Sequence, residues 1–390
     1  MTFLCNLGEV NLPKLPLLDL DEHKKVFTIS GKSVASLLKD KFPHQVFQEA
    51  REYDPIVAVC ITGIVDYFVS LLGIYYIKWN LGGRKNKVLV SLGSLKNVSL
   101  ISRILNITPV TVNINNSMYV NNISEYYNSI EIKLFTLWRT FAEEAVYDYC
   151  DRFSLKKPTR CTSVQPSGTK SLVPFVSPGI HWPKASYFIR RVTFAKEAPI
   201  AKACIDYGLN IIPSSSSIDE NGVMLDDINH DLVKDWLVEF PSKVPYADLC
   251  DLIGTDLTNI PFQSQFELWK NCQKYYCNNG FNTSVTLELW EDEIDIASEL
   301  IYEAIKEGWY ITCAMLSRTN DTFPRMPFEP ITKDIYEEQM QKVLERRKVD
   351  KSLEDIILSY YTQDTTEENP EAACDSGSCN LVKVSNSNER

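Results

Sequence analysis

Apolar positions along this chain recur with two periods, one near two residues and one near 3.6 residues, which are typical of strands and helices. Partial alternation in "TFLCNLGEVNL" predicts a strand near the start, followed by a loop that Pro13 and Pro16 interrupt. Over residues 30–50 the apolar and polar residues recur with the spacing of a helix. The apolar run "YDPIVAVCITGIVDYFVSLLG" comes next and contains a turn-permitting glycine at Gly63.

Strand and helix patterns continue to alternate further along the chain. "NKVLVSLGSL" is typical of a strand that turns into a helix, and residues 122–152 predict a long amphipathic helix. Its apolar stripe consists largely of Tyr126, Leu134, Leu137, Trp138, Phe141 and Tyr147. We expect further strands at "SYFIRRVTF", "LVEFPSK", "TSVTLEL" and "WYITCAML", and a helix at "DEIDIASELIYEAIKEG". This alternation indicates an α/β fold with a substantial parallel sheet.

The last 30 residues differ in composition from the rest. From about Tyr361 onward the sequence loses its apolar periodicity and gains acidic, serine and glycine residues, a composition typical of a disordered tail. We therefore expect a folded part over residues 1–360 and a flexible tail over residues 361–390. The tail contains two cysteines, Cys374 and Cys379, which are either functional or incidental.

Composition and charge narrow the functional classes. The content of 44% hydrophobic residues supports a large core, and the net charge of -11 opposes binding to nucleic acid or to an anionic membrane. The first residues lack the basic opening and cleavage pattern of a signal peptide, and no apolar run reaches the ~18 residues of a transmembrane helix. A cytoplasmic location is the expectation.

The 11 cysteines are an odd number, which favours mostly reduced thiols over a disulfide framework. Four lie in apolar surroundings, where we expect buried and inert side chains: Cys60, Cys204, Cys250 and Cys313. Cys272 and Cys277 have the same spacing as the tail pair, but the helical context "CQKYYC" favours a structural role. The histidines lack metal-ligand spacing, so no zinc site is expected.

One short polar turn has phosphate-binding character. It consists of Pro166, Ser167, Gly168, Thr169, Lys170 and Ser171, and we call it the phosphate turn. A glycine lets the backbone approach a phosphate closely, while N–H, hydroxyl and ammonium groups donate hydrogen bonds. Taken alone, "PSGTKS" also fits an ordinary surface turn, and it lacks the spacing of a P-loop.

The residues around this turn resemble a known family. "VQPSGTKSLV" and "SPGIHWPKASYFIRRVTF" are similar to the phosphate-binding region of the adenosylcobalamin-dependent, class II ribonucleotide reductases, and most of all to the monomeric triphosphate-reducing branch. "CNLGEVNL", "REYDPIVAVCITGIVDYF", "SVTLEL" and "FPRMPFEPITKDIYEE" agree with that family in the same order. The resemblance spans nearly the whole chain and includes the terminal Cys-x4-Cys.

The resemblance implies roles for three cysteines. Cys5 matches one half of the active-site dithiol that reduces the substrate radical and becomes a disulfide. Cys374 and Cys379 match the mobile pair that re-reduces this disulfide by exchange and is then reset by a thioredoxin-type reductant. Exchange requires an accessible thiolate, so a pair that visits both a buried site and an external reductant needs a flexible tether.

The resemblance also implies a fold and a partner. The family fold is a ten-stranded α/β barrel, of which residues 1–360 correspond to the second half. The radical cysteine, the other thiol of the dithiol and the usual allosteric region lie before this point in the family, so we expect an N-terminal half on a separate chain. That half-barrel partner, adenosylcobalamin and a ribonucleotide would complete the enzyme.

Three other readings stay open at this point. A class I large-subunit fragment is similar, although its turn more often contains Pro-Thr-Ala; a non-catalytic nucleotide-binding protein is another alternative. A processed or degenerate gene product would also look like a half-enzyme. His181, Arg190 and Arg191 match family positions, but their chemistry assigns them no role.

Overall fold

The computed structural model describes residues 5–42, 44–85, 90–168, 170–172, 175–277, 280–318 and 324–360. The chain divides into two compact units. The first unit consists of Met1–Arg190 and Pro241–Glu337, and the second of Arg191–Phe240 and Glu338–Arg390. The predicted tail, including Cys374 and Cys379, lies outside the described residues, so the expected boundary at residue 360 stays a prediction.

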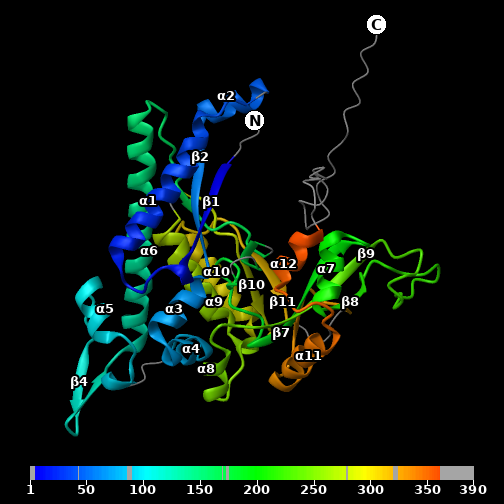
Figure 1. The fold of residues 1–390 in the computed structure, drawn as a ribbon. Coiled ribbons are helices and arrows are strands. Elements are labelled where there is room, and N and C mark those ends of the chain that lie inside the picture. The colour runs from blue at the N-terminus through cyan, green and yellow to red at the C-terminus, as the bar shows by residue number, and fades with distance from the viewer. Residues whose placement is uncertain are drawn as a thin grey trace. The chain divides into compact units, whose positions relative to one another are not determined.

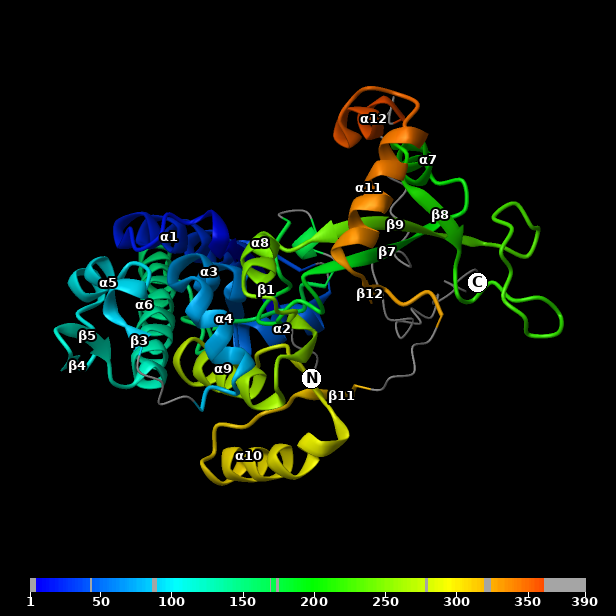
Figure 2. The same cartoon turned by 90° about the horizontal axis from the view of Figure 1, so that it is seen from below.

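The first unit holds most of the secondary structure (Figures 1 and 2). Its strands are β1 (Cys5–Asn11), β2 (Ile56–Thr62), β3 (Val90–Ser91), β4 (Thr111–Ile114), β5 (Ser117–Val120), β6 (Thr162–Ser163), β10 (Thr286–Leu289), β11 (Ala314–Ser317) and β12 (Phe328–Pro330). Its helices are α1 (Leu20–Ser36), α2 (Gln45–Tyr53), α3 (Ile64–Leu72), α4 (Ile74–Leu81), α5 (Val98–Leu105), α6 (Ile123–Arg152), α8 (Ala247–Leu252), α9 (Phe262–Tyr275) and α10 (Ile294–Lys306).

A row of parallel strands forms the centre of this unit. β1 pairs with β2 along its whole length, and β2 pairs with β6 through Val59 and Thr162. A parallel bridge from Val164 to Thr283 continues the row toward β10, which pairs in parallel with β11. The predicted parallel sheet is therefore confirmed. β3, β5 and β4 form a separate antiparallel sheet in that order.

Helix positions agree with the sequence except near residue 40. The helix expected over residues 122–152 is α6, which begins where the Asn122 side chain accepts a hydrogen bond from the Glu125 N–H at 3.2 Å. The single helical stretch expected over residues 30–50 is wrong, because α1 ends at Ser36 and α2 begins only at Gln45. Pro43 lies between them, and a proline cannot continue an α-helix.

The β2–α3 connection shows why a glycine ends this strand. Gly63 adopts φ 70°, a left-handed conformation that side-chain-bearing residues rarely adopt. A β-carbon there would lie 2.6 Å from Cδ of Pro13, so both the backbone conformation and the packing require glycine.

Helix α1 packs against helix α6. His23 on α1 links the two helices, because its ring accepts a hydrogen bond from the Trp138 indole N–H on α6. The same ring contacts the Pro16 carbonyl.

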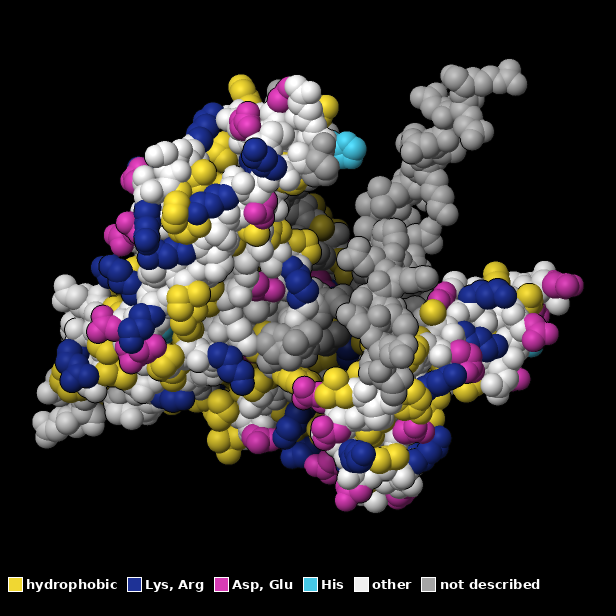
Figure 3. Space-filling model, turned by 45° about the horizontal axis from the view of Figure 1, so that its top comes forward, with side chains coloured by type: hydrophobic (Ala, Val, Ile, Leu, Met, Phe, Trp, Pro, Cys, Tyr) yellow, Lys and Arg dark blue, Asp and Glu magenta, His cyan; other side chains and the backbone are white. Residues whose placement is uncertain are grey.

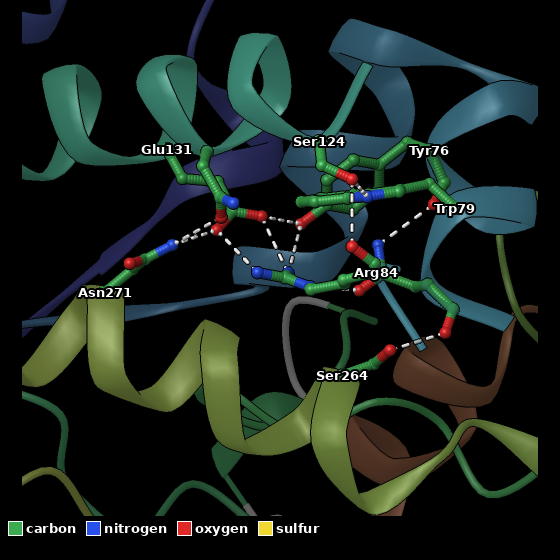
Figure 4. Close-up of polar contacts among 9 residues, drawn as sticks. Tyr76, Trp79, Arg84, Ser124, Glu131, Ser264 and Asn271 are labelled. Carbon is green, nitrogen blue, oxygen red and sulfur yellow. Dashed lines mark hydrogen bonds and ion pairs between the residues drawn. The ribbon is translucent and has the colours of Figure 1, made fainter. Parts of the chain in front are cut away.

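A buried ion pair connects three helices of the first unit (Figure 4). The Arg84 guanidinium donates two hydrogen bonds to the Glu131 carboxylate, at 2.8 and 3.0 Å, and the two side chains are 2% and 0% exposed. Tyr76 on α4 donates to the same carboxylate at 2.6 Å, and Asn271 on α9 at 2.7 Å. Arg84 also lies over the Trp79 ring, 4.4 Å from its centroid. Both charges thus have several partners.

The second unit contains α7 (Pro199–Tyr207), β8 (Asn210–Pro213) and α12 (Leu353–Tyr360). β7 (Tyr187–Ala195), β9 (Asp235–Lys243) and α11 (Lys333–Arg346) each run across the boundary between the units. Within the second unit, β8 pairs antiparallel with β9, and α7 packs against α12. Ala201, Cys204, Trp236 and Val343 contribute to its small separate core.

The described surface carries both charge signs. On the face drawn in Figure 3, basic and acidic side chains are interspersed, and no broad basic area is visible there. Among the described residues, no helix is long and apolar enough to cross a membrane.

Replacing Glu131 by Gln should lower the free energy of unfolding by about 3–5 kcal/mol, because the buried Arg84 charge would lose its counter-charge. Denaturant unfolding measures this change. Glu303→Gln is the matched control, since Glu303 pairs with Lys306 at a site where both side chains are more than half exposed. A loss below about 1 kcal/mol is expected for the control, and an equally small loss for Glu131→Gln would contradict the structural role of the pair.

Candidate functional site

Cys5 and the phosphate turn lie on one face of strand β1. Side chains alternate along a strand, so Cys5, Leu7 and Glu9 share a face. Glu9 contacts the Ser167 hydroxyl, which also donates to the Gln165 carbonyl at 3.2 Å. Cys5 and Glu9 are four positions apart on the strand, which corresponds to roughly 13 Å between their Cα atoms. The structure therefore brings a thiol and the phosphate turn to the same surface of the sheet.

The phosphate turn follows the end of β6 directly. Pro166, Gly168 and Lys170 are exposed, whereas Ser167 and Ser171 are buried. The Ser171 N–H donates to the Ser167 carbonyl at 3.0 Å and so closes the turn. The turn ends in a short 3-10 helix, Lys170–Leu172. Thr169 lies outside the described residues.

The segment after the turn is anchored to the carboxyl end of β2. Asp66 accepts hydrogen bonds from Ser177, at 2.7 Å from its N–H and 2.5 Å from its hydroxyl. Burial raises the pKa of Asp66, and the Ser177 hydrogen bonds oppose that shift. Gly179 donates its N–H to the Thr62 hydroxyl at 2.9 Å. These contacts hold the segment where the parallel strands end.

His181 links the same segment to β10. Its Nδ1 donates to the Pro178 carbonyl at 2.9 Å, and its Nε2 accepts from the Thr286 N–H at 2.9 Å. Because Nε2 accepts, the ring is neutral, which agrees with the lowering of its pKa by burial. His181 is therefore a structural link between two segments.

The basic residues that follow His181 in the chain also have partners. Lys184 contacts Glu288, and the Arg318 guanidinium donates to the same carboxylate at 3.1 Å. Burial, and secondly the Arg318 charge, lower the pKa of Lys184 to about 8 despite its acidic partner. Arg190 lies over the Phe328 ring, and Arg191 pairs with Glu239 at 2.7 Å. These contacts account for both arginines structurally.

The Cys5 thiol is partly buried and electrostatically influenced by Arg160. Burial raises the pKa of Cys5 from 9.0 to about 12, although the Arg160 guanidinium lowers it. The Arg160 guanidinium donates a hydrogen bond to the Asp54 carboxylate at 3.1 Å. β1, β2 and β6 are parallel, so these three side chains gather near the amino ends of the strands. The thiol is therefore protonated near neutral pH.

Sequence reasoning missed Glu9 and Arg160. Glu9 stands at i+4 from Cys5, and on a predicted strand that spacing indicates a shared face. Arg160 had no comparable signal, because only the pairing of β1, β2 and β6 brings it near Cys5. Among the described residues, no three His, Cys, Asp or Glu side chains gather as a metal ion would require.

The cysteines expected in the core are mostly there. Cys60, Cys204 and Cys250 are buried, and burial raises the pKa of each thiol. Cys313 is only half-buried, because it lies just before β11, whose side chains are exposed. Cys272 and Cys277 are both buried, as the helical context of "CQKYYC" predicted.

Comparison with known proteins gives one consistent result. The adenosylcobalamin-dependent ribonucleoside-triphosphate reductase of Euglena gracilis is 26% identical over 268 residues, which are 67% of this chain and 32% of that protein. The reductase of the same name from Lacticaseibacillus paracasei is 22% identical over 339 residues, 86% of this chain and 38% of that protein. The chain is a relative of the adenosylcobalamin-dependent ribonucleoside-triphosphate reductases. The family resemblance is thus confirmed.

A solved structure described as a B12-dependent, class II ribonucleotide reductase shares the fold. Its TM-score is 0.60 at 19% identity, and the match covers 93% of this chain and 42% of that one. No protein-family model matches the chain. The chain spans about a third of the length of the two reductases above, and this partial coverage fits a C-terminal half.

Replacing Gly168 by Val should weaken nucleoside-triphosphate binding by about 10- to 100-fold, equivalent to losing about 1–3 kcal/mol of hydrogen bonding to phosphate. A β-carbon at Gly168 meets no atom within 4 Å, so folding should be unaffected. Calorimetric titration and thermal unfolding together test both expectations.

Gly208→Ala is the opposite control for that experiment. Gly208 has φ 101°, and a β-carbon there would lie 2.1 Å from the Val343 carbonyl oxygen. This variant should lose thermal stability and keep its affinity in the folded state. A Gly168→Val protein that melts early but binds normally would make the phosphate turn structural.

Alkylation of Cys5 at pH 8 should be roughly a thousandfold slower than alkylation of a free thiol whose pKa is 9.0, because the raised pKa leaves far less thiolate. The rate should still be rising with pH at pH 10. Arg160→Gln should slow it further, since the guanidinium lowers the pKa of Cys5. Mass spectrometry of the Cys5 peptide measures the rate, with glutathione as the reference thiol. Equal rates for Cys5 and glutathione at pH 8 would rule out the desolvated thiol.

Proposed function

We propose that this chain is the C-terminal part of an adenosylcobalamin-dependent ribonucleotide reductase and acts on ribonucleoside triphosphates. The observation that carries the proposal is the shared face of β1, where Cys5 lies in line with Glu9 and the phosphate turn. A ribonucleotide held by its phosphates at Gly168 and Lys170 would extend along this face toward the Cys5 thiol. The names of the related reductases support the choice of triphosphates and of the cofactor.

Cys5 would supply half of the reducing equivalents. In the net reaction, a hydrogen replaces the 2′-hydroxyl of the ribonucleotide, water leaves, and two thiols become one disulfide. Each thiol gives up one hydrogen atom, so atoms and electrons balance. Cys5 is one of these thiols; the second thiol and the radical-bearing cysteine would belong to the rest of the reductase. Its raised pKa keeps Cys5 protonated and therefore able to give up hydrogen.

The rest of the reductase would pack against both ends of the strand row. Among the described residues, no strand pairs with the outer edge of β1 or of β11. Leu7 on β1 is 44% exposed, and Met315 and Leu316 on β11 are 54% and 51% exposed. Apolar outer strands are a liability unless another strand covers them. We propose that these edges close a ten-stranded barrel with the N-terminal half, on a separate chain or earlier in a longer one.

Adenosylcobalamin would need residues beyond the described ones. The surface hollow beside Trp290, Glu291 and Asp292 has a volume of about 570 Å³. Pockets of ~300–1,000 Å³ suit drug-sized ligands, and adenosylcobalamin is larger than these. This hollow therefore does not fit the whole cofactor, and we propose that the N-terminal half supplies most of its contacts.

Reconstitution tests the proposed function. The chain alone, given ribonucleoside triphosphate, adenosylcobalamin and a dithiol, should form no deoxynucleotide in a single turnover. Adding the N-terminal half of the reductase should restore product formation. Cys5→Ser in the restored enzyme should stop complete reduction and leave triphosphate binding unchanged, because a serine cannot close the disulfide. Product formation by the isolated chain would show that the radical site is elsewhere.

Cys374→Ser or Cys379→Ser should abolish multiple turnover with thioredoxin, because the exchange relay needs both tail thiols. A small dithiol should still support turnover, since it can reach the active-site disulfide by diffusion. Ser378→Ala is the matched control, because it changes the spacer and keeps both thiols. Equal loss of activity with both reductants would contradict a shuttle role for the tail.

A further inference from the structure

A second thiol pair closes the carboxyl end of α9. The N–H groups of Tyr276 and Cys277 both donate to the Cys272 carbonyl, at 2.8 and 3.0 Å. The bond from Cys277 spans six residues, and Tyr276 stays right-handed at φ -102° and ψ -53°, so α9 ends in a widened last turn. This bond joins the backbones of Cys272 and Cys277 directly.

The close approach of the two backbones suits a disulfide. A disulfide requires Cα atoms about 4.4–6.8 Å apart, and a direct backbone hydrogen bond between the two residues keeps their backbones close. Cys272 and Cys277 are free thiols in this structure and are almost wholly buried. Burial, and next a hydrogen bond with Cys277, raise the pKa of the Cys272 thiol, which agrees with direct contact between the two.

Cys277 is the more accessible thiol of the two, because it is 4% exposed and Cys272 is 0% exposed. Its sulfur lies 3.0 Å from the Thr283 hydroxyl, which can donate a hydrogen bond to a thiolate. Cys204 offers an internal comparison, because it is also buried and burial alone raises its pKa. Cys277 differs from Cys204 in that the Cys272 thiol and the Thr283 hydroxyl lie beside it.

Thr283 connects this pair to the phosphate turn. The Thr283 N–H donates to the Gln273 side-chain oxygen at 2.9 Å, and the Thr283 backbone forms the parallel bridge to Val164. Ser284 donates its N–H to the Val164 carbonyl at 2.7 Å. Val164 stands two residues before Pro166, the first residue of the turn. A change at the Cys277 sulfur therefore has a short covalent and hydrogen-bonded path to the turn.

We propose that Cys272 and Cys277 form a redox-active dithiol, which peroxide oxidises to a disulfide that alters the phosphate turn. The Cys277 thiolate attacks peroxide, forms a sulfenic acid and releases the first water after protonation. The Cys272 thiol then displaces hydroxide from that sulfur, which leaves as the second water with the Cys272 proton. Two electrons and two protons pass from the thiols to peroxide. The disulfide removes the Cys277–Thr283 hydrogen bond and so releases one restraint on the strand beside the turn.

Mass mapping tests the disulfide directly. The full chain carrying Cys374→Ser and Cys379→Ser is treated with hydrogen peroxide, denatured in N-ethylmaleimide and digested. The peptide with Cys272 and Cys277 should be two hydrogens lighter and free of maleimide, and dithiothreitol should reverse this. Cys204 should carry maleimide in the same sample. Maleimide on both Cys272 and Cys277, or irreversible sulfinic acid on either, would overturn the proposal.

Nucleotide affinity tests the link to the turn, which rests on the proposed function. Oxidised protein should bind a ribonucleoside triphosphate several-fold more weakly than reduced protein, and dithiothreitol should restore the affinity. Cys272→Ala and Cys277→Ala, each checked by thermal unfolding, should bind nucleotide and not respond to peroxide. A disulfide that forms without changing affinity would overturn the link to the turn. If no form binds triphosphate, the proposed function fails, while the mass result still decides the dithiol.

Discussion

The buried Arg84–Glu131 ion pair is the interaction on which the first unit depends. A charge that is removed from water needs a counter-charge and hydrogen bonds, and here one carboxylate serves an arginine, a tyrosine and an asparagine. The carboxylate is on α6, Tyr76 is on α4, Arg84 follows α4 and Asn271 is on α9, so these hydrogen bonds join the three helices. α9 then leads into Tyr276, whose hydroxyl donates to the Val59 carbonyl on β2 at 2.8 Å. The polar helix junction thereby fixes the position of the sheet.

The sheet in turn organises the candidate site. Parallel strands bring their like ends together, so the phosphate turn after β6 and the anchored segment around Ser177 meet at the carboxyl ends. Cys5 lies at the other end of β1, and strand alternation alone puts it on the face that Glu9 and Ser167 share. The same burial that orders this region raises the pKa of Cys5. The position of the phosphate turn and the protonation of the Cys5 thiol therefore both depend on how this sheet is packed.

The buried thiols differ in their neighbours. Burial is the one cause that raises the pKa of Cys204, because desolvation disfavours the thiolate. Cys272 and Cys277 are also buried, but the last turn of α9 joins their backbones by a hydrogen bond. The context "CQKYYC" correctly indicated the core and a helix, whereas the meeting of the two sulfurs depends on how that helix ends.

The sequence by itself determined the elements and the family. Apolar periodicity predicted β1, α6 and α10 because side-chain burial repeats with the geometry of each element, and the blocks around Cys5 and Gly168 indicated the reductases. It did not predict the break near residue 40 or the separate second unit. Only the tertiary structure decided that Glu9 meets Ser167, that Arg160 lies near Cys5, and that His181 is a structural link. Those contacts join residues far apart in the chain, so local patterns carry no information about them, and strand register fixes them.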